Sequence, residues 1–111
     1  MYLINVKEEN RMIFTEPASL ELKNVFNKVK ELFDTLITGI EDKKEDKIAK
    51  CEEIEAELDL IVKEVRTNHL TRLRNNKCMP LSGVTFADMI LHLERIGDLL
   101  YGVSRNFRNI D

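Results

Sequence analysis

Apolar side chains recur every three or four residues in the last third of the chain. At about 100° per residue, such a series forms one stripe along an α-helix. The pattern predicts a helix over about 83–106, in which Leu93 lies at the centre of the stripe and is buried. The members of the stripe are Phe86, Met89, Ile90, Leu93, Ile96, Gly97, Leu100, Val103 and Phe107.

Two similar series precede this stripe. The first covers residues 22–40 and predicts a helix over about 19–40, which Gly39 and the charged run after it should end. The second covers residues 48–73 and predicts a helix over about 45–75. Both segments are long enough to span a small domain.

Three long helices with short connections predict an all-α fold, an antiparallel three-helix bundle with up-down-up topology. Residues 1–16 show no helical period and are expected to form an N-terminal arm or linker. Residues 17–111 then make a single domain, since 111 residues suit one modest core. Ser82 is a plausible N-cap for the third helix.

The composition of the chain excludes some classes of function. The net charge of −3 comes from interspersed acids and bases, so no basic face for a nucleic acid is indicated. No apolar run approaches the roughly 18 residues of a membrane span, and the N-terminus lacks a signal-peptide pattern. Cys51 falls on an apolar stripe, Cys78 falls in a loop, and no CxxC motif is present. A reducing compartment, the cytoplasm, is therefore expected.

Two pairs of acids are the main candidate site. Glu55 and Asp59 lie one helical turn apart, as do Glu94 and Asp98, and both pairs flank an apolar stripe on the same rotational side. In two antiparallel helices these flanks should meet at nearly the same height. Four carboxylates in one groove would suit a divalent or trivalent cation such as Mg, Mn, Fe or Zn. Alternatively, they accept hydrogen bonds from arginines or remain solvated.

Other polar residues allow two interpretations each. His69 lies in the middle of the second stripe, where a buried, hydrogen-bonded histidine is favoured over a metal ligand. Arg66 lies near that helix's C-terminus and either complements the helix dipole or clamps an anion or carboxylate; Arg95 is similar. Asp88 lies four residues before His92, on another part of the surface. No phosphate loop, nucleophile elbow or HExxH motif is present, so an enzyme is not expected.

Residues 66–98 resemble the C-terminal half of a PhoU-like domain, of the type attached to bacterial sodium/phosphate cotransporters. The likeness covers about residues 15–104 and is most specific in the last third. It rests on four groups of residues: Glu55 with Asp59; Arg66, His69, Arg72 and Leu73; Cys78, Pro80, Ser82 and Gly83; and Asp88 with Leu93, Glu94, Arg95, Ile96, Gly97 and Asp98.

The resemblance implies a PhoU-like (spectrin-like, up-down-up) bundle whose ExxxD motifs hold metal in some members. By residue, the motifs match Glu55 with Asp59 and Glu94 with Asp98. It also implies a regulatory or interaction role in phosphate transport, at the inner face of the cell membrane when a transporter domain is attached. Other implied partners are a phosphate-signalling protein and a second copy of the chain, since PhoU proteins carry two three-helix repeats.

The sequence departs from the family pattern after the last acidic pair. The family often continues with His and Asn where this chain has Leu99 and Gly102. An alternative function therefore stays open, a helical oligomerisation module whose acidic groove is solvated and holds no metal.

Overall fold

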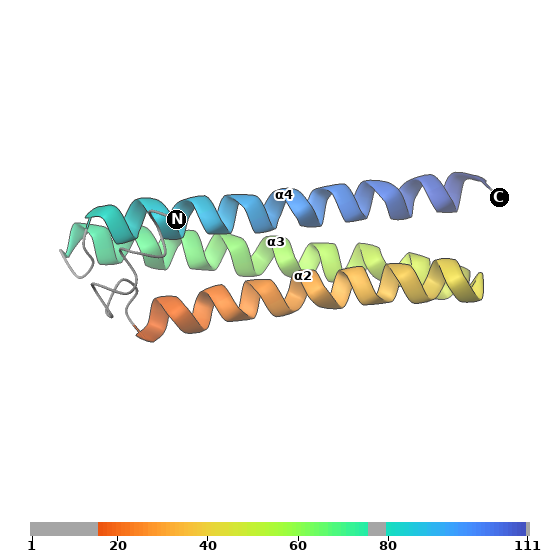
Figure 1. The fold of residues 1–111 in the computed structure, drawn as a ribbon, viewed down its shortest axis with the longest axis horizontal. Coiled ribbons are helices and arrows are strands. Elements are labelled where there is room, and N and C mark those ends of the chain that lie inside the picture. The colour runs from red at the N-terminus through yellow and green to blue at the C-terminus, as the bar shows by residue number, and fades with distance from the viewer. Residues whose placement is uncertain (1–15, 76–79, 111) are drawn as a thin grey trace, which may run out of the picture.

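The computed structural model describes residues 16–75 and 80–110, which form three helices. They are α2 (Glu16–Asp42), α3 (Glu45–Arg74) and α4 (Pro80–Ile110). Helix α3 runs antiparallel to the other two, and each helix packs against both others (Figure 1). The described residues contain no strand. The predicted all-α, antiparallel three-helix bundle is confirmed.

Helices α2 and α4 are longer than the periodicity indicated, whereas α3 matches its predicted range of 45–75 to within one residue. Helix α2 begins at Glu16, so Pro17 occupies its first turn, where a missing N–H costs nothing. Helix α4 begins at Pro80, which places Ser82 inside the first turn and not at the N-cap. The expected arm lies almost wholly outside the described residues, and so does Cys78 in its predicted loop.

The prediction that Gly39 ends the first helix is wrong. Gly39 is buried inside α2, and a Cβ added there would lie 2.9 Å from Ile48 Cδ1 of α3. The turn comes later, at Lys43 and Lys44, inside the charged run as predicted, and Lys43 has a φ of 53°. The Lys44 N–H donates to the Gly39 carbonyl. The glycine therefore serves close helix packing next to a two-residue turn.

The inward-facing positions of all three helices alternate in steps of three and four residues. This spacing averages 3.5, the period of a left-handed supercoil. The positions of this series, buried or half-buried, are Ala18, Leu22, Val25, Val29, Leu32, Leu36 and Gly39 in α2; Ile48, Cys51, Glu55, Leu58, Val62, Val65, His69 and Arg72 in α3; and Gly83, Phe86, Ile90, Leu93, Gly97, Leu100 and Ser104 in α4. Ile54 of α3, next to this series, is also fully buried.

The predicted stripe of α4 was too wide. Four of its members, Met89, Ile96, Val103 and Phe107, are exposed. Leu93 packs against the core but is only half-buried, so the expectation of a buried centre there is wrong. The predicted stripe combined residues from two neighbouring strips of the α4 surface. Only one of these strips faces the core, and the exposed members belong to the other.

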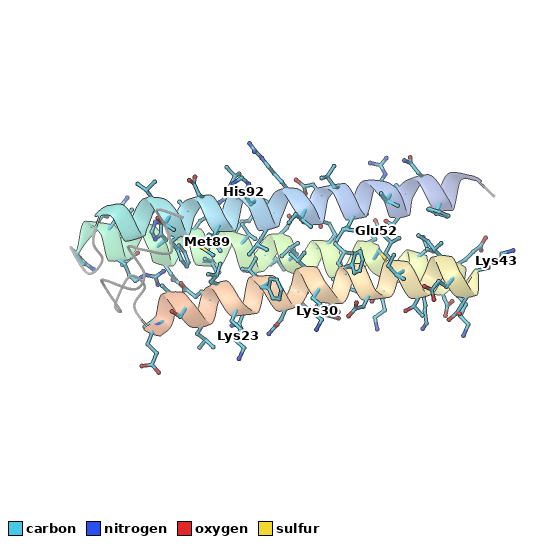
Figure 2. The ribbon with its side chains drawn as sticks, viewed as in Figure 1. Lys23, Lys30, Lys43, Glu52, Met89 and His92 are labelled. Atoms are coloured by element: carbon cyan, nitrogen blue, oxygen red, sulfur yellow. The ribbon has the colours of Figure 1, made fainter. Side chains whose placement is uncertain are left out.

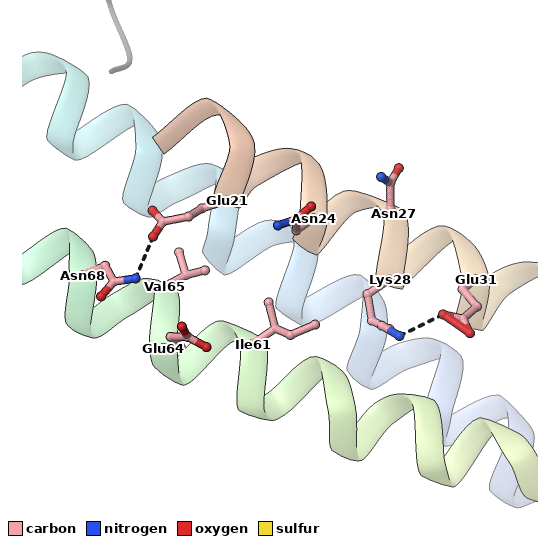
Figure 3. A pocket seen from close by; sticks show the side chains of 9 residues that line it. All are labelled: Glu21, Asn24, Asn27, Lys28, Glu31, Ile61, Glu64, Val65 and Asn68. Carbon is pink, nitrogen blue, oxygen red and sulfur yellow. Dashed lines mark hydrogen bonds and ion pairs between the residues drawn. The ribbon is translucent and has the colours of Figure 1, made fainter. Parts of the chain in front are cut away.

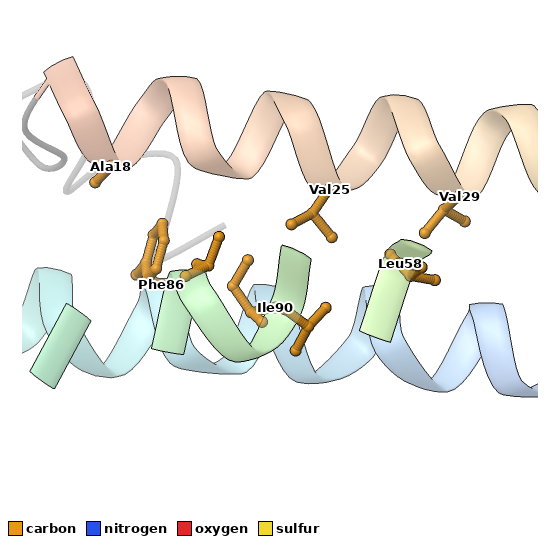
Figure 4. Close-up of a cluster of buried hydrophobic side chains, with 8 residues drawn as sticks. Ala18, Val25, Val29, Leu58, Phe86 and Ile90 are labelled. Atoms are coloured by element: carbon orange, nitrogen blue, oxygen red, sulfur yellow. The ribbon is translucent and has the colours of Figure 1, made fainter. Parts of the chain in front are cut away.

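The core consists of two apolar clusters. One includes Val25, Val29, Leu58, Phe86 and Ile90 (Figure 4). The other surrounds Leu32, Leu36, Ile48, Cys51 and Ile54 nearer the α2–α3 turn. Leu100 packs against both clusters. In α3, the residue between the two clusters is Glu55, an acid at an inward position.

Candidate functional site

Glu55 is a carboxylate held inside the bundle. It occupies an inward position of α3, one turn before Leu58, and only 8% of its surface is exposed. Its Oε2 atom has no hydrogen-bond partner among the described residues. A buried polar atom without a partner costs about 1–3 kcal/mol, and more when charged. The site therefore contains an acceptor that the protein alone leaves unsatisfied.

Gly97 of α4 makes room for this carboxylate. A Cβ added at Gly97 would lie 3.5 Å from Glu55 Oε2 and 2.5 Å from Leu58 Cδ2. Any larger side chain there would push Leu58 out of place. The glycine thus lets α4 approach α3 closely at the level of Glu55.

Two further carboxylates converge on Glu55. Asp59 lies one turn further along α3, and Asp98 follows Gly97 in α4. One carboxylate oxygen of each of the three residues lies within 4.8 Å of the other two. Oxygens bound to a single hard cation at about 2.1–2.5 Å are at most about 4–5 Å apart, so the spacing suits one ion. Asp59 and Asp98 are exposed, which leaves one side of the group open to solvent.

The protonation of Glu55 reflects these surroundings. Burial, first of all, raises the pKa of Glu55 to about 7, because a charged carboxylate loses its hydration there. The negative charge of Asp59 raises the pKa further, and so does the nearby carboxylate of Asp98. Without a cation, Glu55 is thus partly protonated near neutral pH.

Glu94, the fourth predicted acid, is paired differently. Its Oε1 accepts a hydrogen bond of 2.5 Å from Arg66 Nη2 across the α3–α4 groove. Of the two interpretations of Arg66, the carboxylate clamp matches this contact. Glu94 still lies close enough to add to the raised pKa of Glu55. Arg95 and Asp88 are both exposed and outside the group of three acids.

His69 lies nearer the other end of α3 and packs on α4. Its ring centroid lies 4.9 Å from that of Phe86, and it is half-buried. Burial and then the charge of Arg72 lower its pKa, while a hydrogen bond with the Gly83 backbone opposes them. Arg72 itself lies over the Phe86 ring at 5.5 Å. His69 therefore belongs to the packing between helices, away from the acids.

The α2–α3 side of the bundle has a polar groove of about 400 Å³ (Figure 3). Glu21 in this groove accepts hydrogen bonds from Asn68 at 2.8 Å and from Arg72 at 2.6 Å. Lys28 pairs with Glu31 at 2.9 Å. The contacts of Glu21 cross between the helices, so this side of the bundle holds α2 and α3 together.

Some of these roles could not be identified from residue types alone. Gly97 counted only as a member of the apolar stripe, and Glu21 was not considered. The inward position of Glu55 was available in the three-and-four spacing from Ile48 to Leu58. It was missed because an acid is normally assigned to a flank.

No helix in the described part of the chain is long and apolar enough to cross a membrane. Comparison with known families matches residues 22–106 to the PhoU domain. No curated protein and no solved structure gave a match. The matched region covers all of α3, most of α2 and α4, and every acid of the site.

Proposed function

Because the chain belongs to the PhoU domain family, a regulatory family without catalytic activity, we propose that it regulates phosphate transport and binds a metal ion through Glu55, Asp59 and Asp98. Membership itself indicates a regulatory helical domain of phosphate homeostasis. The metal and the transporter are the proposed refinements. The observation that carries the metal proposal is the buried, unpartnered Oε2 of Glu55 beside two further carboxylates.

The donor set fits a hard or borderline cation such as Mg, Mn, Fe or Zn. Three carboxylates supply oxygen ligands, and a cation would compensate the charge that burial penalises at Glu55. Bound metal would also lower the pKa of that carboxyl group, so binding releases protons. The exposed side of Asp59 and Asp98 leaves coordination positions for water or a phosphate oxygen. Such a site would respond to phosphate when loaded with metal.

The proposed partners follow from this role. The domain would lie in the cytoplasm and act on the membrane domain of a sodium/phosphate cotransporter or on a phosphate-signalling protein. It would also pair with a second copy of itself. The resemblance of residues 66–98 to domains attached to such cotransporters supports the first partner.

A helical oligomerisation module without metal is the second candidate. The contact between Arg66 and Glu94 favours it, because that pair removes one of the four acids from the groove. The raised pKa of Glu55 favours it as well, since a protonated carboxyl needs no cation. The two candidates differ in metal content.

The test compares the parent chain with the double variant Asp59→Asn with Asp98→Asn. Protein purified without chelator is analysed for metal, and thermal unfolding is followed with added Mn²⁺, Mg²⁺ or Zn²⁺, each with and without phosphate. The proposal expects metal in the parent, a higher Tm with metal, and a further rise with phosphate. The double variant should lose all three effects.

A matched control is Asp42→Asn with Asp88→Asn. It removes the same charge from two exposed acids outside the site. It should keep the parent's metal content and stabilisation. Equal metal behaviour of the site variant and the parent would reject the site and leave the oligomerisation module.

A further inference from the structure

An exposed apolar surface is shared by α2 and α4. We call it the α2–α4 face. Each of its members exposes more than a third of its surface: Phe26, Phe33, Ile37, Met89, Ile96, Val103 and Phe107. Exposed apolar surface of this extent, rimmed by charges, is typical of an interaction site.

The two halves of this face lie on the sides of α2 and α4 that turn away from α3. On α2, the opposite side faces α3 through the contact of Lys28 with Glu57. On α4, the opposite side faces α3 through Glu94, which pairs with Arg66. Figure 2 shows Met89 on the side of α4 that faces α2. The apolar residues of both helices therefore lie on the same side of the bundle, away from α3.

We propose that the α2–α4 face binds a second copy of the chain in antiparallel orientation, around a two-fold axis at the level of Leu32. In this arrangement α2 lies along α2 of the second copy, and α4 along α4. The proposal adds the surface and its register to the pairing suggested above. It is independent of the metal site, which lies between α3 and α4.

The charges along the edge of the face support this register. Lys23, Lys30, Asp34 and Glu41 are all exposed, and each lies three or four residues from an apolar member of the face in α2. Figure 2 shows Lys23 and Lys30 on the outer side of α2. This edge is basic in the first half of α2 and acidic in the second. Antiparallel pairing therefore places opposite charges across from each other.

The two charge pairs share one centre. Lys23 and Glu41 are equally distant from residue 32, and so are Lys30 and Asp34. An axis at that level brings Lys23 opposite Glu41 of the second copy, and Lys30 opposite Asp34. A parallel pairing of α2 would instead align like charges.

Five of the seven apolar residues fit the same axis to within about one residue, whereas Met89 and Phe107 have no counterpart across it. Phe26 comes opposite Ile37 of the second copy, and Phe33 lies beside its own copy. In α4, Ile96 and Val103 are centred next to Leu100, so they come opposite each other. Leu100 packs against the core cluster of Leu32, so the two centres lie at the same level of the bundle. A single axis therefore serves both helices.

The size of the face is adequate for a weak specific dimer. With its charged edge, the face is about 27 Å long on each helix at 1.5 Å per residue, from Met89 to Phe107 in α4 and from Lys23 to Glu41 in α2, and two helices of about 10–12 Å make it about 22 Å wide. The flat area is about 600 Å² per copy, or about 1,200 Å² in total, which is the lower end of specific interfaces. Association should therefore depend visibly on concentration.

The first test is sedimentation velocity of the full chain from about 1 to about 500 μM, a range suited to weak interfaces. The parent should reach twice the 13.0 kDa of one chain. Phe33→Glu should remain at 13.0 kDa, because it brings two carboxylates together at the axis. Phe33 is 48% exposed, so the variant should fold, which circular dichroism checks. The control Leu60→Glu changes a residue of α3 that is 67% exposed, and it should dimerise like the parent.

The second test examines the register. Lys30→Glu should weaken dimerisation about tenfold, because two attractive contacts become repulsive. Combining Lys30→Glu with Asp34→Lys should restore the parent's affinity, since the charges are exchanged across the axis. A monomeric parent would overturn both the dimer and this surface. A dimer that resists Phe33→Glu would overturn the surface alone, and failed rescue would overturn the register; none of these results affects the metal proposal.

Discussion

Glu55 and Gly97 face each other across the α3–α4 contact, and the absence of a side chain at Gly97 is what gives the carboxylate its place. The Cβ of an alanine at residue 97 would lie 3.5 Å from Glu55 Oε2 and 2.5 Å from Leu58 Cδ2. The first of these distances is ordinary contact, whereas the second is a clash with a fully buried leucine. The candidate site therefore depends on a residue that offers no ligand.

Gly97→Ala should destabilise the bundle. Overpacking costs about 1–3 kcal/mol, while alanine regains up to about 1 kcal/mol of helix propensity. The control is Gly102→Ala, where a Cβ meets no atom within 4 Å. That variant should gain about 1 kcal/mol, because only the propensity changes. Urea unfolding of both variants checks this, and equal effects would contradict the close approach at Gly97.

Glu55 should make the metal-free protein less stable as pH rises. Its pKa is raised from 4.5 to about 7 in the folded chain, so between these values the folded state binds more protons than the unfolded state. The free energy of unfolding should then fall from pH 4.5 to pH 7, by roughly 3 kcal/mol at most. Below pH 4.5 Glu55 is protonated in both states, so burying its charge no longer lowers the free energy of unfolding.

Glu55→Gln should remove this pH dependence. The measurement is urea unfolding in the presence of a chelator at several pH values, with the parent as reference. The difference between the two chains isolates Glu55 from His69, whose lowered pKa acts in the opposite direction. If the free energy of unfolding of parent and variant depended on pH in the same way, the site would not disfavour the charged form of Glu55.

Arg66→Gln should strengthen metal binding if the proposed site is real. Arg66 pairs with Glu94, an acid whose negative charge acts on Glu55. Its loss frees Glu94 as a fourth acid and removes a competing cation. Stability should change by less than about 1 kcal/mol, because Arg66 is half-exposed. Titration with Mn²⁺ followed by calorimetry should give a lower Kd than the parent, and an unchanged or higher Kd would contradict this view of the groove.

Leu58 and Leu93 should differ in their importance for folding. Leu58 is fully buried, so Leu58→Ala should cost about 2–5 kcal/mol. Leu93 is half-buried, so its truncation should cost clearly less. Both are measured by urea unfolding. A larger loss of stability for Leu93→Ala than for Leu58→Ala would support the stripe inferred from the sequence. It would contradict the side of α4 that the structure turns toward the core.

The sequence was sufficient to predict the bundle, because periodic apolar residues and charged turns specify helices directly. The spacing of Glu55, Asp59 and Asp98 in the sequence was also sufficient to predict that these acids lie close together. It could not predict that Arg66 takes Glu94, because an ion pair between helices depends on side-chain rotamers. It misjudged Leu93 since Met89 and Ile96 look like core residues on an isolated helix. Only the packed bundle reveals that they face outward.

The space left by the missing side chain of Gly97 also limits how the helices can be aligned along their length. In α4, the residues one heptad away on the same seam are Ile90 and Ser104. If α4 slid by seven residues, either side chain would replace the glycine at the level of Leu58, and both carry the Cβ that does not fit. Sliding would also move Asp98 about 10 Å from Glu55. A slide of one heptad is therefore unfavourable, and the observed register keeps the three acids together.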